Sequence, residues 1–181
     1  IVFVSLAEYS YDLKFSCCLA EMELLSWLTN GLKEILLEQN SEGENFFHEV
    51  ARSGSFSLLS RFAPYVRGFD AAAGLNTRNH NGQMALHVAA VTHDKLYAVK
   101  LIQVLKELGA DINGQEGAEG NTVLHLAVSQ QRYELAEWLS FQEDIDLEIR
   151  NNDNLTPLEM AKSKKDKKMM KILKNGYNQR R

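Results

Sequence analysis

Short apolar stretches with the spacing of a helix face alternate along this chain with polar turns that contain glycine. Residues 99–108 carry apolar side chains at positions 99, 101, 102, 105 and 108, and Gly109 follows them as a helix stop. Residues 124–128 and 133–139 supply two more short apolar faces, and residues 23–38 have the pattern of a longer amphipathic helix. Helices this short are marginal alone in water. The pattern predicts an all-α protein whose helices are stabilised by packing on one another.

One of these stretches recurs four times, as residues 45–51, 84–90, 122–128 and 156–162. The central positions His48, His87, His125 and Glu159 are separated by 39, 38 and 34 residues. Such a period indicates a repeat protein built from a turn and two helices, with insertions in the first two units. Two positions upstream of each copy stands a turn residue that tolerates a positive φ: Gly43, Gly82, Gly120 and Asn154. Each copy also has a small residue in its helix: Ala51, Ala89, Ala127 and Ala161.

These positions have structural interpretations. We expect the alanines to lie where neighbouring repeats approach closely, because a larger side chain would overpack that contact. We expect each histidine to bridge backbone groups of the turn beside it. In the fourth copy Thr156 is a predicted N-cap, Pro157 occupies the first helical position, and Glu159 completes a capping box.

The chain therefore divides into four predicted segments. Residues 1–21 are expected to be an extension, because the chain begins with Ile rather than Met and Met22 stands directly before the next segment. Residues 22–41 are predicted to form an N-terminal capping helix. Residues 42–174 are predicted to form an ankyrin-like solenoid of about four repeats, whose charged last helix is a polar cap, and residues 175–181 a basic tail. The expected repeats are about 42–79, 80–116, 117–151 and 152–174.

The 181 residues suffice for one substantial hydrophobic core. Charge is distributed unevenly along them. Residues 162–181 contain nine Lys and Arg and the single acid Asp166, which leaves 11 basic and 23 acidic residues before them, a body charge of about −12. An acidic body disfavours direct nucleic-acid binding and favours basic protein partners. The basic end has two interpretations, a solvated helix face or a segment for docking or localisation.

Common sequence motifs for catalysis are absent from this chain. There is no Gly-x-x-x-x-Gly-Lys phosphate loop and no Gly-x-Ser-x-Gly turn. His48 and Glu49 begin a zinc-protease motif, but Arg52 stands where its second histidine is required. Histidines at one repeat position lie about a repeat apart, too far to share a metal ion. We expect a protein that is not an enzyme and holds no cofactor or metal.

The cysteines and the apolar start of the chain indicate in which cellular compartment the protein is expected. Cys17 and Cys18 are neighbours and are poorly placed for an ordinary disulfide, which fits a reducing interior. Charged residues from Glu8 onward interrupt the apolar start of the chain, so we expect neither a signal peptide nor a membrane span.

The repeated motif resembles the Thr-Pro-Leu-His-x-Ala signature of ankyrin repeats. Residues 109–116 followed by 120–128, with the Gln-Glu insertion at 115–116, resemble the later repeats of the inhibitor of kappa B family. Within that family the chain is most similar to the viral ankyrins of polydnaviruses. The resemblance implies a non-catalytic inhibitor that binds a Rel/NF-κB-type transcription factor dimer, blocks DNA binding or nuclear entry, and suppresses host immune signalling.

Two departures from the family's pattern shape this expectation. Cellular relatives carry an Asp-Ser-Gly-x-x-Ser degradation signal and an acidic tail, whereas Ser53-Gly54-Ser55 lacks the aspartate and the chain ends in basic residues. The resemblance therefore implies inhibition without signal-induced degradation, over a narrower range of partners. The expected location is the cytoplasm, with the nucleus as an alternative, of an infected host cell, and the free protein is expected to be a monomer.

The predicted contact residues are polar positions beside the turns and after the first helix of each repeat. Acids at the turns are expected to meet a basic segment of the partner, so that salt weakens binding. A merely solvated role stays open for each residue, and a generic ankyrin adaptor or a fragment of a larger ankyrin protein are the alternative functions. The predicted set is Arg78, His80, Gln83, Glu116, Glu119, Asn121, Asn152 and Asp153 at the turns, and Thr92, Asp94, Gln130, Gln131 and Arg132 after the helices.

Overall fold

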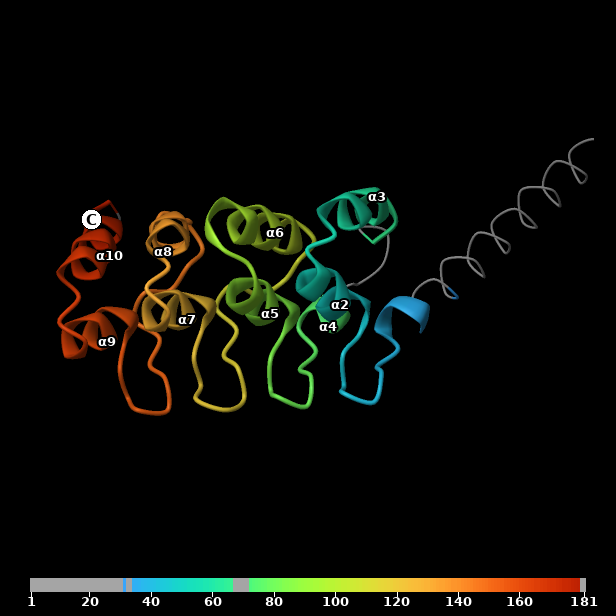
Figure 1. Cartoon of the computed structure of the whole chain (residues 1–181), viewed down its shortest axis with the longest axis horizontal. Coiled ribbons are helices and arrows are strands. Elements are labelled where there is room, and N and C mark those ends of the chain that lie inside the picture. The colour runs from blue at the N-terminus through green and yellow to red at the C-terminus, as the bar shows by residue number, and fades with distance from the viewer. Residues whose placement is uncertain (1–30, 32–33, 67–71, 180–181) are drawn as a thin grey trace, which may run out of the picture. The chain divides into compact units, whose positions relative to one another are not determined.

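The computed structural model describes residues 31, 34–66 and 72–179 (Figure 1). The chain divides into two compact units, residues 1–35 and 36–181. The first unit lies almost wholly outside the described residues, as do the expected extension 1–21 and most of the expected capping helix 22–41. The second unit contains the repeats. All regular secondary structure among its described residues is helical, which confirms the predicted all-α fold.

The helices follow one another in pairs. A short extra helix, α4, stands between the first pair and the second. No helix among the described residues has the length and apolarity needed to cross a bilayer. The bounds are α2 Phe46–Ser53, α3 Phe56–Val66, α4 Ala72–Leu75, α5 Ala85–Thr92, α6 Lys95–Glu107, α7 Val123–Ser129, α8 Tyr133–Ser140, α9 Pro157–Ser163 and α10 Lys167–Asn178.

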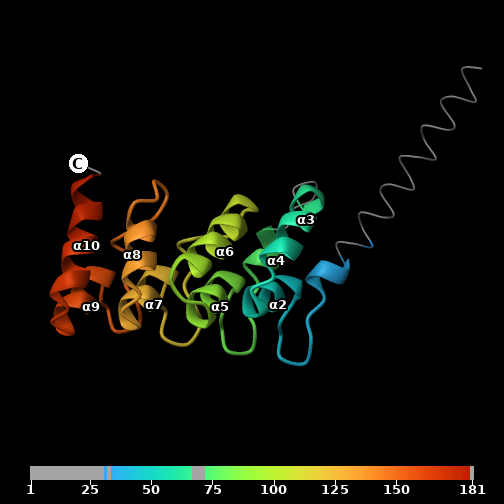
Figure 2. The same cartoon turned by 45° about the horizontal axis from the view of Figure 1, so that its top comes forward.

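The pairs stack into two rows of helices. The inner helices α2, α5, α7 and α9 form one row, and the outer helices α3, α6, α8 and α10 form the other (Figures 1 and 2). Four loops, called fingers here, project from the inner row away from the outer row (Figure 1). They are residues 38–45, 76–84, 110–122 and 145–156, one ahead of each inner helix. Apolar side chains fill the space between the rows, among them Leu59, Leu86, Ile102, Leu105, Leu124, Leu135, Leu139 and Leu173.

The alanines of the repeated motif are fully buried within the inner helices. Ala89, Ala127 and Ala161 are each 0% exposed and occupy the same position two residues after the His or Glu. In the first repeat Val50 holds that position, and Ala51 comes one residue later. A γ-branched or aromatic side chain at these fully buried positions would overpack the interior.

Helix α9 begins at the predicted cap. The Thr156 hydroxyl accepts a hydrogen bond from the backbone N–H of Glu159, whose carboxylate accepts one from the N–H of Thr156, and Pro157 opens α9. Thr122 caps α7 in the same way. Met84 makes no side-chain cap hydrogen bond to α5, and its own backbone N–H donates to Nδ1 of His87 at 3.2 Å.

The last helix extends further than the sequence suggested. α10 continues to Asn178, so residues 175–178 belong to the fourth repeat and not to a basic tail. Gly176 permits close packing of this added turn: a Cβ there would lie 2.7 Å from the Cβ of Ser140, so only glycine lets α10 approach α8 this closely. The Tyr177 hydroxyl also donates to the carbonyl of Leu147 at 2.8 Å.

The start of the repeat region also differs from the expected boundary. Residues 34–37 are helical, but residues 38–45 form the first finger, so the division expected at residue 41 cuts through a finger. The described residues between Pro64 and Arg78 contain the end of α3, α4 and the start of the second finger. Each repeat is therefore a finger followed by its helix pair.

Gln131 adopts a left-handed conformation with φ of 56°, a region that favours glycine. We predict that Gln131→Gly raises the free energy of unfolding by about 1 kcal/mol. Gln130→Gly is the matched control, because Gln130 has an ordinary φ of −96°, so that glycine relieves no strain there, adds unfolded-state entropy and removes an exposed hydrogen bond from Arg132. Urea titration of the three proteins measures both changes, and destabilisation by both substitutions would contradict the prediction.

Candidate functional site

Eight of the thirteen predicted contact residues lie in the fingers, and each turn is organised by one polar side chain at its base. The Asn40 side chain accepts the backbone N–H groups of Glu42 and Glu44, both at 2.9 Å. Asn79 and Asn151 accept turn N–H groups in the same way in the second and fourth fingers. The turns have positive φ at the four predicted residues, Gly43, Gly82, Gly120 and Asn154.

The third finger uses Glu116 in place of asparagine. It has one more residue than the second finger between the base residue and the helix cap. The longer carboxylate spans this turn and accepts the N–H groups of Ala118, Glu119 and Asn121 at 2.6, 2.7 and 3.0 Å. Burial raises the pKa of Glu116, but these three backbone donors outweigh it and lower the pKa below its ordinary value.

Neighbouring fingers are joined at their tips by backbone hydrogen bonds. The His80 N–H donates to the carbonyl of Glu42 at 2.9 Å, and the Gly117 N–H donates to that of Gly82 at 2.8 Å. The Asn152 N–H donates to the carbonyl of Glu119 at 2.9 Å. The spacing of the tips is therefore set by the main chain.

A second connection runs between finger bases through long polar side chains. The Gln39 amide lies 3.4 Å from the carbonyl of Arg78, and the Arg78 guanidinium donates to the carbonyl of Gln115 at 2.7 Å. The Gln115 amide in turn donates to the carbonyl of Arg150 at 2.9 Å. Arg78, a predicted contact residue, thus joins two fingers while it remains exposed.

Buried histidines connect each inner helix to the next finger. The backbone N–H of Met84 donates to Nδ1 of His87 at 3.2 Å, and Nε2 lies 3.0 Å from the carbonyl of Gly114. A backbone N–H only donates and a carbonyl only accepts, so the ring must be neutral with its proton on Nε2. His48 and His125 make the corresponding bonds to the carbonyls of Gln83 and Leu155.

His48, His87 and His125 are structural, as expected, but one of the two bonds of each ring goes to a different turn from the one predicted. Each ring bridges two repeats, because its second partner belongs to the following finger. Glu159 replaces histidine in the fourth repeat, where no further finger follows within the described residues. Its carboxylate instead pairs with Arg150 at 2.7 Å.

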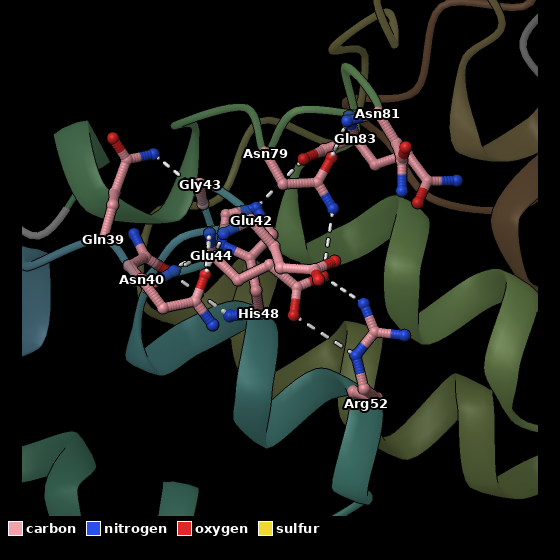
Figure 3. Close-up of polar contacts among 11 residues, drawn as sticks. Gln39, Asn40, Glu42, Gly43, Glu44, His48, Arg52, Asn79, Asn81 and Gln83 are labelled. Carbon is pink, nitrogen blue, oxygen red and sulfur yellow. Dashed lines mark hydrogen bonds and ion pairs between the residues drawn. The ribbon is translucent and has the colours of Figure 1, made fainter.

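Figure 3 shows how the first two fingers meet above α2. Glu44 is 6% exposed, and its carboxylate accepts hydrogen bonds from the Arg52 guanidinium and from the Asn79 amide. Burial raises the pKa of Glu44, but Arg52 and Asn79 outweigh it and lower the pKa. Asn151 and Asn121 make the related contact between the fourth and third fingers at 3.0 Å.

The turns after the inner helices form a second polar area. Arg132 donates to the carbonyls of Val91 and His93 in the preceding repeat and pairs with Asp94 at 3.3 Å. A hollow of about 520 Å³ opens beside it, lined by Asp94, Gln130, Gln131, Arg132, Glu134 and Leu135. Four of the predicted contact residues therefore line one concavity.

The structure separates the thirteen predicted residues by accessibility. Glu116 and Asn121 are 6% and 2% exposed, so their side chains serve the fingers and offer little to a partner, which corrects their proposed contact role. Gln83 and Arg132 are half-buried. The exposed residues are Arg78, His80, Thr92, Asp94, Glu119, Gln130, Gln131, Asn152 and Asp153.

Two exposed tip residues were missed by the sequence reasoning. Glu42 and Asn81 precede the turn glycines of the first and second fingers, the position that Glu119 and Asp153 hold in the third and fourth. Aligning the chain on the glycines would have found them. The exposed tips form what we call the finger row, which carries three acids and no Lys or Arg: Glu42, His80, Asn81, Glu119, Asn152 and Asp153.

Comparison with known proteins agrees with this architecture. A family model for three copies of the ankyrin repeat matches residues 47–150 and 96–181. I-Kappa-B like protein H1 of Microplitis demolitor bracovirus is 38% identical over 78% of this chain and 72% of its own. I-Kappa-B like protein C2 of the same virus is 36% identical over 77% of this chain and 76% of its own length. Protein N1 is 39% identical over 60% of this chain and 78% of its own length.

The neutral histidines make stability sensitive to acid. Burial lowers the pKa of His87 from 6.5 to about 4, so the unfolded chain binds a proton first as the pH falls. Stability from this group is therefore lost between pH 6.5 and about 4, by up to about 3 kcal/mol. We predict that His87→Gln lowers the free energy of unfolding at pH 7 by about 2 kcal/mol. In this variant the free energy of unfolding should also decrease less steeply as the pH falls.

Urea titrations between pH 7 and pH 4 measure both effects. His80→Gln is the control, because it removes an exposed imidazole from a fingertip and should leave the stability at pH 7 nearly unchanged. An unchanged acid dependence in His87→Gln would contradict the assignment of this proton.

Proposed function

This chain belongs to the ankyrin-repeat family and, within it, to the I-kappa-B-like proteins of bracoviruses, and from that membership we propose that it binds a Rel/NF-κB-type transcription factor dimer. In this proposal it acts as a non-catalytic inhibitor, which blocks DNA binding or nuclear entry and suppresses host immune signalling. The observation that carries the proposal is the finger row, in which the acids Glu119 and Asp153 stand on neighbouring repeats and Glu42 on the first finger.

The finger row suits a basic protein segment. Glu119 and Asp153 lie on adjacent fingers that the Asn152-to-Glu119 backbone bond holds together. Both side chains are exposed and neither forms an ion pair among the described residues. Segments that bind DNA phosphates or serve nuclear import are rich in Lys and Arg, so acids at this spacing attract them and exclude DNA from the same surface.

The contact area extends from the fingers to the turns after the inner helices. Asp94, Gln130 and Gln131 stand around the 520 Å³ hollow and offer amide and carboxylate groups to a partner side chain. Ankyrin stacks change shape little when the bonds between repeats are regular, so such a surface binds without a large ordering cost.

We also propose that the inhibition is not ended by signal-induced degradation. The one Ser-Gly-Ser run of the described residues, 53–55, lies between α2 and α3, where Gly54 ends α2 in a left-handed conformation with φ of 69°. The hydroxyls of Ser53 and Ser55 lie 2.9 Å apart. This compact turn does not present an extended peptide to a modifying enzyme, and the expected site of action is the cytoplasm or nucleus of the infected host cell.

The experiment is binding of the purified chain to a Rel homology-domain dimer at low and high salt, with κB DNA as competitor. We predict salt-sensitive binding that excludes DNA. Glu119→Lys with Asp153→Lys should weaken it about tenfold, or ~1.4 kcal/mol. Glu137→Lys with Glu143→Lys makes the same charge change at exposed sites outside the finger row and should bind like the unaltered protein.

Two outcomes would contradict the proposal. Equal weakening by both double variants would show that net charge, and not the finger row, determines affinity. No binding at micromolar concentration would leave a generic ankyrin adaptor for a different protein client.

A further inference from the structure

The C-terminal end of the stack carries a concentrated positive surface, which we call the lysine face. It comprises the end of α9, the following turn and α10. Asp166 is the one acid in this stretch, and its carboxylate is already occupied by the N–H of Met169 at 2.9 Å and the Tyr133 hydroxyl at 3.1 Å. All members of the lysine face are exposed: Lys162, Lys164, Lys165, Lys167, Lys168, Lys171 and Lys174.

The positive charge of this face is not compensated. None of its lysines forms an ion pair with a described residue. Lys164 donates to the carbonyl of Ser129 at 3.0 Å, and the Lys168 ammonium lies 4.0 Å from the ring centre of Tyr133. By contrast, several basic residues elsewhere in the repeats pair with a carboxylate: Arg52, Lys106, Arg132 and Arg150.

Helix stability does not account for these lysines. Lys167 and Lys168 occupy the first turn of α10, which contains no acid, although a helix N-terminus favours negative charge. Lys171 is three or four residues from Lys167, Lys168 and Lys174, and like charges at these spacings repel. A polar end cap requires only solvated side chains, and a mixture of signs would serve it better. Neither helix stability nor a polar end cap therefore explains the uniform sign.

We propose that the lysine face binds an acidic segment of a protein partner. Lys167, Lys171 and Lys174 follow one side of α10 over about 10 Å, from the rise of a helix. An extended peptide covers that distance with about three or four residues, so a short run of Asp or Glu places several carboxylates within reach. Lysine ammonium groups on flexible stems donate hydrogen bonds to carboxylates without a fixed geometry.

Other anionic partners fit this face less well. Membrane binding by a surface helix requires an apolar side, and Met169 and Leu173, the apolar side of α10, are fully buried. Single-stranded nucleic acid requires free aromatic rings for stacking, but Lys168 lies over the Tyr133 ring. A long duplex also meets the acidic remainder of the chain, whereas a short peptide touches the lysine face alone.

The test uses the full chain and a fluorescent oligo-glutamate peptide, with anisotropy as the readout, and contains no Rel protein, so its result is independent of the proposed function. Lys167→Glu with Lys171→Glu should weaken peptide binding about tenfold or more. The thermal unfolding midpoint of this double variant should stay the same or rise, because an acid in the first turn of α10 interacts favourably with the helix dipole. The matched control is Arg61→Glu with Lys100→Glu, an equal charge change at exposed sites of α3 and α6 that should keep the affinity.

Three results would overturn the inference. The first is no peptide binding at low salt and micromolar protein, and the second is equal weakening in both double variants. The third is tighter binding of duplex DNA or of phosphatidylserine vesicles than of a peptide with the same charge. Lys171→Gln with Lys174→Gln, which adds no acid, should give an intermediate loss and separates charge from any change in folding.

Discussion

The buried imidazole at the start of an inner helix accepts a hydrogen bond from its own repeat and donates one to the next finger, and the stack depends on this pair of bonds. His87 illustrates the constraint, because Met84 has no side-chain cap and the carbonyl of Gly114 lies in the interior. Without the ring, a buried N–H and a buried carbonyl would both lose their partner. A single side chain thus fixes both the start of a helix and the position of the following finger.

These hydrogen bonds within the stack determine which polar groups remain accessible to a partner. The finger bases and the turns use much of their hydrogen-bonding capacity within the stack, as the bonds from Arg78 and Arg132 to neighbouring carbonyls show. What remains accessible is the finger row and the hollow beside Gln131. The two signs of charge are also separated, with acids at the tips and the lysine face at the end of the last helix pair. A rigid scaffold with separated charges suits the recognition of other proteins, in agreement with the family to which the chain belongs.

Much of the fold was predictable because the repeated motif combines local signals. The capping box of Thr156 and Glu159, the turn glycines and the small residues of the inner helices each depend on nearby atoms, and the structure contains all of them. The candidate site was predictable only in part. A polar residue in a turn is expected to be exposed, but Glu116 is buried because its finger has an additional residue for a longer side chain to span. The reach of Arg132 into the preceding repeat and the extension of α10 on Gly176 depend on contacts between repeats, which spacing along one chain does not reveal.

The central claim is that the fingertips, held at fixed spacing by the bonds between repeats, are the surface that meets the partner. Hydrogen exchange of the backbone amides, with and without a Rel homology-domain dimer, tests it most directly. The account predicts slower exchange on binding at the tips, residues 41–43, 80–82, 117–120 and 152–154, with no change along the outer helices α6 and α8. Protection confined to the outer helices, with the tips unchanged in a bound complex, would contradict it.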